Sequence, residues 1–148
     1  MDRFQQLLYD LSELIEVPLY AEENLCRINI NDLFDVQMEY DSGKETVLLA
    51  SFCAEIPPGR FRENVLKETL KANAIYPRVG TYGYVEQSNQ LALFEIISLQ
   101  NLSPEKFSDL LARFVDRVDR AKKAVENNLV HELMEVNSEY NHSAFHLI

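Results

Sequence analysis

Three histidines are the residues of this sequence whose spacing first suggests chemistry, and that chemistry would be zinc binding. The stretch His131-Glu132-Leu133-Met134-Glu135 begins like the H-E-x-x-H helix of zinc proteases, which places two histidine ligands on one helix face. Glu135 stands where the second histidine is required, so this motif lacks a ligand. His142 and His146 are four residues apart in a polar tail, where two ligands alone make at most an adventitious metal site. The sequence therefore predicts no metal site.

The two cysteines are the candidate nucleophiles, but neither has a histidine close in sequence that could act as its base. Cys26 and Cys53 each lie in an apolar, strand-like segment, so we interpret them as buried, reduced side chains rather than a disulfide. No G-x-S-x-G elbow occurs, and the four glycines form no phosphate-binding pattern. We expect no cofactor and no catalytic residue. An enzyme whose site is assembled only in three dimensions is one of the hypotheses left open.

Composition narrows the class of protein. The 148 residues include 24 acidic and 14 basic side chains, and the formal net charge of −10 opposes binding to nucleic acid. Hydrophobic residues make up 47% and charged residues 26%, which is typical of a globular domain. No apolar stretch approaches the ~20 residues of a membrane helix, and no basic segment with an apolar signal core opens the sequence. We expect a cytoplasmic protein without membrane insertion.

The first half of the sequence predicts one helix followed by three strands. Apolar residues three and four apart form a helical stripe over about residues 2–16: Phe4, Leu7, Leu8, Leu11, Leu14 and Ile15. From residue 25 to residue 52 the apolar period drops to two, and turn-forming residues at 31–32 and 41–44 divide this stretch into three antiparallel strands. The third strand is apolar on both faces, so we expect it at the centre of the sheet or covered on both sides.

The second half predicts a helix, a hairpin and a long helix. Helical spacing covers about residues 59–74, and residues 82–86 and 91–99 indicate a second hairpin whose apolar strand is central. Ser103-Pro104-Glu105 opens the third helix with a capping hydroxyl, a proline in the first turn and an acid near the positive helix end. A continuous helix to Asn137 would exceed ~50 Å, so we expect a break or a projection near Asn127-Asn128.

This order of elements, α-β-β-β-α-β-β-α, predicts an α+β fold in which a twisted antiparallel sheet is covered by helices. The sequence contains no repeat and no linker. We therefore interpret residues 1–137 as a single domain and residues 138–148 as a C-terminal tail.

Apolar residues exceed what such a small sheet needs. Every helix has an apolar stripe, and two strands are apolar on both faces. The predicted second helix shows this most clearly, because its apolar residues occupy more than one stripe: Phe61, Val65, Leu66, Leu70, Ala72 and Ala74. A well-filled core explains the surplus, and so does a subunit interface.

Five stretches together carry a family resemblance. They are the opening helix Phe4-Gln5-Gln6-Leu7-Leu8, the three-strand meander, the helix from Arg60 to Asn73, the strand pair around Gly83-Tyr84 and Asn89-Gln90-Leu91, and the closing helix that starts Leu102-Ser103-Pro104-Glu105-Lys106-Phe107. Over about residues 4–126 this pattern resembles the Tir chaperone (CesT-like) family of class I type III secretion chaperones. Phe61-Arg62, Gly80-Thr81-Tyr82-Gly83-Tyr84 and Ser88-Asn89-Gln90-Leu91 are further similar to chlamydial chaperones that serve the secretion gatekeeper.

The resemblance implies a non-catalytic chaperone that binds an extended segment near the N-terminus of a secreted effector or gatekeeper protein and keeps it soluble and secretion-competent. It also implies a dimer that pairs through the second helix and the fourth and fifth strands, with these candidate interface residues: Val65, Leu66 and Leu70. Apolar grooves on the first helix and the sheet would receive the effector, at these candidate positions: Leu8, Leu11, Ile28 and Phe34.

Several alternatives stay open at this point. Because the resembling gatekeeper chaperones work as heterodimers, the partner chain is either a second copy or a related chaperone. The extension past Asn127 is longer than the family pattern and is either a clamp on partner or cargo, or a tail. An acidic regulatory adaptor that binds a transcription or signalling protein is the alternative function, since net charge and amphipathic helices allow it equally.

Overall fold

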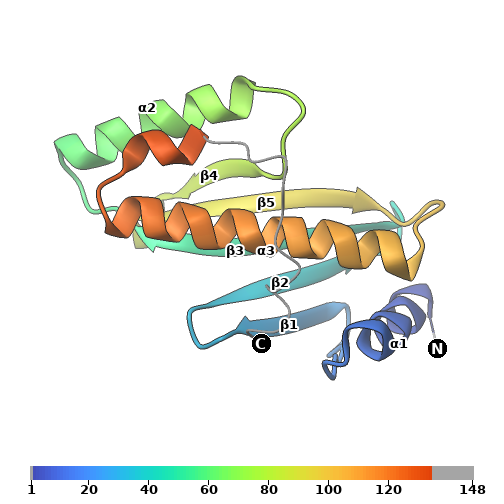
Figure 1. The fold of residues 1–148 in the computed structure, drawn as a ribbon. Helices are drawn as coiled ribbons and strands as arrows, with labels where there is room; N and C mark the ends of the chain where they lie inside the picture. The colour runs from blue at the N-terminus through green and yellow to red at the C-terminus, as the bar shows by residue number, and fades with distance from the viewer. Residues whose placement is uncertain (1, 135–148) are drawn as a thin grey trace.

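The computed structural model describes residues 2–134, and its elements follow the predicted order α-β-β-β-α-β-β-α, with two short 3-10 helices added (Figure 1). Their bounds are α1 Arg3–Ile15, β1 Leu25–Ile30, β2 Phe34–Asp41, β3 Thr46–Glu55, α2 Arg60–Ala74, β4 Thr81–Val85, η1 Glu86–Ser88, β5 Gln90–Ser98, α3 Pro104–Glu126 and η2 Val130–Met134. The predicted α+β class is therefore confirmed.

The five strands form one antiparallel sheet in the order β1-β2-β3-β5-β4. Strands β1, β2 and β3 are the predicted meander, and the β4–β5 hairpin joins it through the pairing of β5 with β3. Strand β3 occupies the centre, as its apolar residues on both faces indicate. Strand β5 also has a neighbour on each side, so the two most apolar strands are both interior strands.

Helices α1 and α3 cover one face of this sheet (Figure 1). Helix α3 runs across β3 and packs against α1, whose Phe4 ring stacks on Tyr40 of β2 with ring centroids 5.3 Å apart. The core lies between these two layers and is built from these fully buried side chains, among others: Phe4, Leu8, Leu11, Met38, Leu49, Leu93, Phe107 and Phe114. Helix α2 lies beside the edge strand β4, and η2 lies between α2 and α3 (Figure 1).

Local capping explains where the long helices begin. The Asp2 side chain accepts a hydrogen bond from the Gln5 amide at 2.8 Å, while the Asp2 amide donates to the Gln5 side chain at 3.0 Å. This reciprocal capping box satisfies two backbone donors at the start of α1. Helix α3 starts as predicted: the Ser103 hydroxyl accepts from the Lys106 amide at 3.1 Å, and Pro104 takes the first helical position.

The second face of the sheet carries apolar side chains that remain accessible in the described chain. Cross-strand neighbours on this face include Leu48 opposite Ile96 and Ala50 opposite Phe94. Ile96 is 64% exposed and Phe52 is 53% exposed, although both lie in interior strands. The helices therefore cover one face of the sheet, and part of the surplus of apolar residues seen in the sequence lies on the other.

The break expected near the two asparagines is confirmed. Helix α3 ends at Glu126, Asn127 is its C-cap, and Asn128 has a left-handed backbone with φ of 56°. The chain then turns into η2 instead of projecting from the domain. The predicted domain end at Asn137, the tail 138–148 and the histidines at 142 and 146 lie outside the described residues.

Candidate functional site

The predicted effector-binding residues lie inside the protomer. All four are buried and belong to the single core cluster: Leu8, Leu11, Ile28 and Phe34. The structure thus brings them together, but as side chains packed against their own chain with almost no accessible surface. Their role in binding an effector stays a prediction. A direct contact would require surface that they do not present in this conformation.

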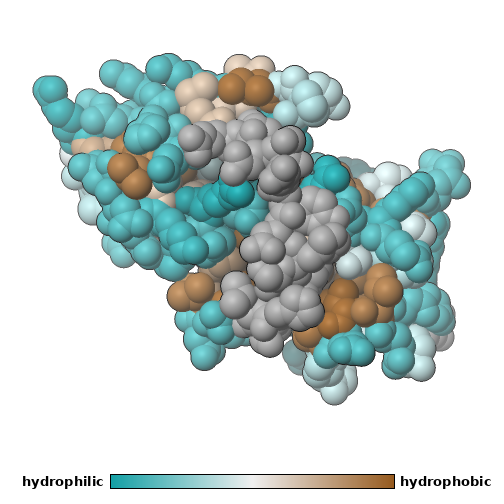
Figure 2. All heavy atoms as spheres, in the orientation of Figure 1, coloured by the Kyte–Doolittle hydropathy of each residue, from teal (hydrophilic) through white to brown (hydrophobic). Residues whose placement is uncertain are grey.

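The three predicted pairing residues have three different environments. Val65 is fully buried, Leu66 is partly buried against the core, and Leu70 is 70% exposed. Ile75 and Tyr76, just past the end of α2, are also accessible. We call Leu70, Ile75 and Tyr76 the α2 patch. Figure 2 shows apolar surface near α2 and a second apolar area over α1.

A further apolar surface lies on the uncovered face of the sheet. We call it the sheet patch, and it consists of these partly or largely exposed side chains of β3 and β5: Leu48, Phe52, Phe94 and Ile96. Gly83 of β4 borders it, because a Cβ placed on that glycine would lie 3.5 Å from the Phe94 ring. The sequence signal for this patch was the apolar character of β3 and β5 on both faces, although the individual residues were not predicted as site residues.

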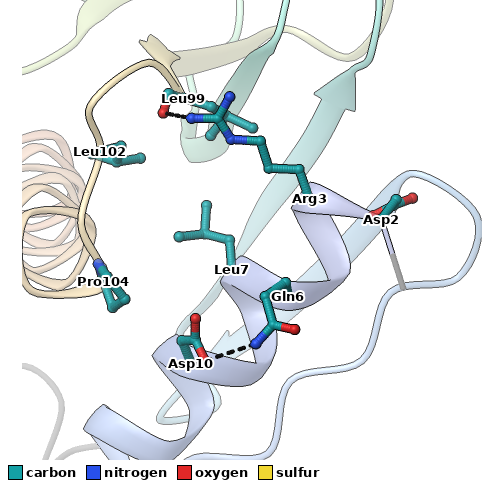
Figure 3. Close-up of a pocket in the computed structure, with 8 residues that line it drawn as sticks. All are labelled: Asp2, Arg3, Gln6, Leu7, Asp10, Leu99, Leu102 and Pro104. Carbon is teal, nitrogen blue, oxygen red and sulfur yellow. Dashed lines mark hydrogen bonds between the residues drawn. The ribbon is translucent and has the colours of Figure 1, made fainter.

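A pocket of about 320 Å³ opens between α1 and the loop that joins β5 to α3 (Figure 3). The loop side of the pocket is apolar and the α1 side is mostly polar, and the lining residues are Asp2, Arg3, Gln6, Leu7, Asp10, Leu99, Leu102 and Pro104. The Gln6 side-chain amide donates to the Asp10 carboxylate at 3.0 Å on the α1 side of the pocket. The pocket therefore combines an apolar surface with acidic, basic and amide side chains.

Arg3 fixes the rim of this pocket. Its guanidinium donates to the Leu99 carbonyl oxygen and to the Glu45 carboxylate, which lies 3.2 Å from Arg3 Nη1. The Tyr40 hydroxyl donates to the same carboxylate at 3.3 Å. Desolvation and the nearby Glu45 charge raise the pKa of Tyr40, so this hydroxyl stays protonated and remains a donor. The start of α1 is thereby tied to both the β2–β3 turn and the end of β5.

The two edges of the sheet differ in what remains available for pairing. On the β4 edge, the Asn73 side chain donates to the Tyr82 carbonyl oxygen at 3.0 Å and accepts from the Tyr82 amide at 2.8 Å. On the β1 edge, Glu22 pairs in the same two-bond manner with Leu25. Backbone groups alternate along a strand, so Arg27 and Asn29 direct their N–H and C=O groups to the same side as Leu25.

The cysteines and the possible metal ligands within residues 2–134 can be located in the structure. No group of three or more His, Cys, Asp or Glu side chains gathers there as a metal site would require. Cys26 and Cys53 are free and buried, and burial raises the pKa of Cys53 to about 12, which keeps the thiol protonated. Burial also raises the pKa of Tyr82 and Glu95. None of these groups with a raised pKa lines the pocket beside α1.

Among the described helices, none combines the length and apolar character that crossing a membrane requires.

The fold matches solved structures of secretion chaperones. The ExsC–ExsE complex superposes with a TM-score of 0.65 at 18% identity, covering 84% of this chain and 97% of that chain. The HopA1–SchA chaperone–effector complex gives 0.61 at 21%, covering 82% and 94%. The Yersinia pestis type III secretion chaperone SycH, in complex with a stable fragment of YscM2, gives 0.63 at 13%, covering 78% and 96%. The fold of this chain is therefore the α+β fold seen in these solved structures, which include a type III secretion chaperone.

The sequence identifies the family. Residues 6–122 match the model of the Tir chaperone protein (CesT) family, and the chain belongs to this family. No curated protein matches the chain significantly. The resemblance predicted over residues 4–126 is thus confirmed, while the segment that follows α3 lies beyond the matched residues.

Proposed function

We propose that this protein is a non-catalytic chaperone of type III secretion that binds an extended segment near the N-terminus of a secreted effector or gatekeeper protein. In the bacterial cytoplasm it keeps that segment soluble and competent for secretion. Membership of the CesT family is the observation that carries the proposal. The HopA1–SchA structure holds a chaperone with its effector, which supports an effector as the partner here.

The β1 edge is the side of the sheet on which we expect the cargo to add a strand. An extended ligand pairs with a sheet edge through backbone hydrogen bonds, and its alternate side chains fill pockets. Asn73 already occupies the outward backbone groups of Tyr82 on β4. Beyond the bridge between Glu22 and Leu25, the outward groups of Arg27 and Asn29 on β1 are the ones that a cargo strand would pair.

The pocket beside α1 supplies an anchor for one cargo side chain. Leu7 on the α1 side and Leu99 and Leu102 on the loop side would bury the stem of that side chain, and Asp10, one turn after Leu7 on α1, would receive a polar or basic end. Buried anchors of this kind dominate the affinity of protein interfaces. We infer that Leu8, Leu11, Ile28 and Phe34, the predicted effector-binding residues, act indirectly by holding α1 and the sheet in place from within the core.

Two chains are expected to pair through the α2 patch and the sheet patch, which flank the edge strand β4. Leu70 is the predicted pairing residue best placed for direct contact, since it is exposed, and Leu66 lies partly accessible one turn before it. Val65 would contribute from inside, by fixing α2 to its own protomer. The partner chain is a second copy or a related chaperone.

Co-expression tests the proposal. The chain is produced together with type III secretion substrates of the same bacterium, each in full length and without its N-terminal segment. We expect one substrate to become soluble and to co-elute with paired chaperone chains only when the N-terminal segment is present. A stable monomer that retains no secretion substrate would contradict the proposal. Recovery of polymerase or signalling proteins without any substrate would favour the regulatory adaptor instead.

A further inference from the structure

The segment after α3 folds back onto the domain instead of leaving it. Asn127 donates to the Lys123 carbonyl oxygen at 2.9 Å, and the Leu129 amide donates to the Ala124 carbonyl oxygen at 2.8 Å. These bonds close the end of α3 while the left-handed backbone of Asn128 reverses the chain. Residues 129–134, which we call the strap, then lie between α2 and α3 (Figure 1).

Leu133 is the anchor of the strap. Its side chain is fully buried, and its carbonyl oxygen accepts two hydrogen bonds, from Arg117 Nη2 of α3 at 2.9 Å and from the Tyr82 hydroxyl of β4 at 3.2 Å. The Arg117 guanidinium also lies over the Tyr82 ring, 5.2 Å from its centroid. A buried carbonyl with two donors from two different elements gives the strap one defined position. The strap therefore joins β4 and α3 at a single point.

Helix α2 packs against the strap as well as against β4. Its contacts with η2 are more extensive than its contacts with β4, the strand beside it. The buried side chains of α2 are Val65, Thr69 and Ala72, on the face opposite to the exposed Leu70. Polar bonds to β4 come from Asn73 near one end of α2 and from Arg62 near the other, where Arg62 Nη1 lies 2.6 Å from the Tyr84 hydroxyl. Without the strap, the apolar middle of α2 would lose the contacts that it makes with η2.

We propose that residues 129–134 are an intramolecular strap that holds α2 in the position from which Leu70 pairs with a second chaperone chain. This inference rests on the proposed pairing function. It assigns a role to residues that lie beyond the family match at 6–122, so the chain carries its own device for setting the pairing helix. For residues 129–134 this role is neither of the two alternatives drawn from the sequence, a clamp on partner or cargo or a tail, because these residues bind their own chain.

Two truncations test the strap. One ends after Met134 and keeps the strap, and the other ends after Asn128 and removes it; both lack residues 135–148. Hydrogen exchange should show at least about tenfold faster exchange of the α2 amides in the shorter chain, with the α1 amides unchanged. Sedimentation should show that the dissociation constant for chain pairing rises at least about tenfold in the shorter chain.

A gentler variant keeps the test decisive if the shorter chain fails to fold. Tyr82→Phe in the full chain removes one of the two donors to Leu133 and should speed exchange in α2 and weaken pairing in the same direction, by a smaller factor. Equal hydrogen exchange of the α2 amides with and without the strap would contradict the proposal that the strap holds α2. Faster α2 exchange with unchanged pairing would overturn its link to pairing. If the chain ending after Met134 and the full chain both stay monomeric, the proposed pairing is contradicted. Hydrogen exchange of the α2 amides then tests by itself whether the strap holds α2.

Discussion

The side chain of Asn73 binds both main-chain polar groups of Tyr82: its amide nitrogen donates to the carbonyl oxygen at 3.0 Å and its oxygen accepts from the amide at 2.8 Å. One α2 side chain thus takes the place of a neighbouring strand on the β4 edge. Edges left unpaired invite additional strands, so this arrangement protects β4 and joins it to α2.

Asn73→Ala is expected to lower the free energy of unfolding by about 1–3 kcal/mol, because it removes two hydrogen bonds from partly buried backbone groups. Urea unfolding measures the change. Asn64→Ala is the matched control, since Asn64 is an exposed asparagine of the same helix. We expect the control to change the free energy by less than about 0.5 kcal/mol. Equal effects of the two substitutions would contradict the role of Asn73.

Arg27→Pro tests the β1 edge. Proline removes the outward N–H of residue 27, and its ring obstructs an incoming strand. Because this N–H makes no bond within the sheet, proline is tolerated at such a position of an edge strand. We expect the variant to fold and to bind cargo at least about tenfold more weakly. Arg27→Ala keeps the N–H and should bind cargo with a smaller loss. Unchanged cargo affinity in the proline variant would move the cargo strand away from β1.

Substitutions in α2 should separate into those that weaken chain pairing and those that lower the stability of the protomer. Leu70→Glu places a charge on an exposed position, so it should abolish chain pairing in sedimentation while leaving the melting temperature of the protomer nearly unchanged. Val65→Ala removes buried methyl groups and should cost about 2 kcal/mol in the free energy of unfolding. Pairing that survives Leu70→Glu would exclude the α2 patch from the interface.

Alkaline pH should destabilise the fold through two buried groups. Burial raises the pKa of Cys53 from 9.0 to about 12, and that of Tyr82 from 10.0 to about 12. The unfolded chain loses these protons at lower pH than the folded chain does. Their contribution to stability is therefore complete below about pH 9 and is lost as the pH rises toward 12, by at most about 1.4 kcal/mol per pH unit for each group.

Urea unfolding under reducing conditions, from about pH 8 to about pH 11, measures this loss. Cys53→Ala should make the decline with pH shallower, because the thiol no longer titrates in the unfolded chain. Cys26→Ala is the comparison for the other buried thiol, whose pKa burial also raises. A decline with the same slope in Cys53→Ala would show that the Cys53 thiol does not contribute to the pH dependence.

The helices and strands could be predicted because their signals are local. The stripe that includes Phe4 and Leu11, the Ser103-Pro104 start and the turn at Asn127-Asn128 each lie within one short stretch of chain. The pairing of β3 with β5 joins residues far apart in sequence, and so does the docking of Leu133 against Tyr82. Periodicity carries no information on such contacts, which is why the position of the strap was not predicted.

The site was harder to predict than the fold. The apolar stripe of a helix packs on the sheet of its own chain, so an apolar stripe does not show which residues remain exposed to a partner. Leu8 and Leu11 lie on the apolar stripe of α1. Their apolar character made them candidates, and it is also the reason that they are buried in the core. On α2, helical spacing separates the buried Val65 and Thr69 from the exposed Leu70, and that spacing could have distinguished the two faces. The pocket beside α1 combines residues 2–10 with residues 99–104, a combination that only the fold creates.

The most direct test of the central claim is mass spectrometry of the complex purified from the native bacterium at native expression level. We predict that the chain is recovered with a second chaperone chain and with one substrate of type III secretion, and that deleting the N-terminal segment of that substrate abolishes its recovery. Recovery of the chain without any secretion substrate, or of a substrate that binds equally well without its N-terminal segment, would contradict the account.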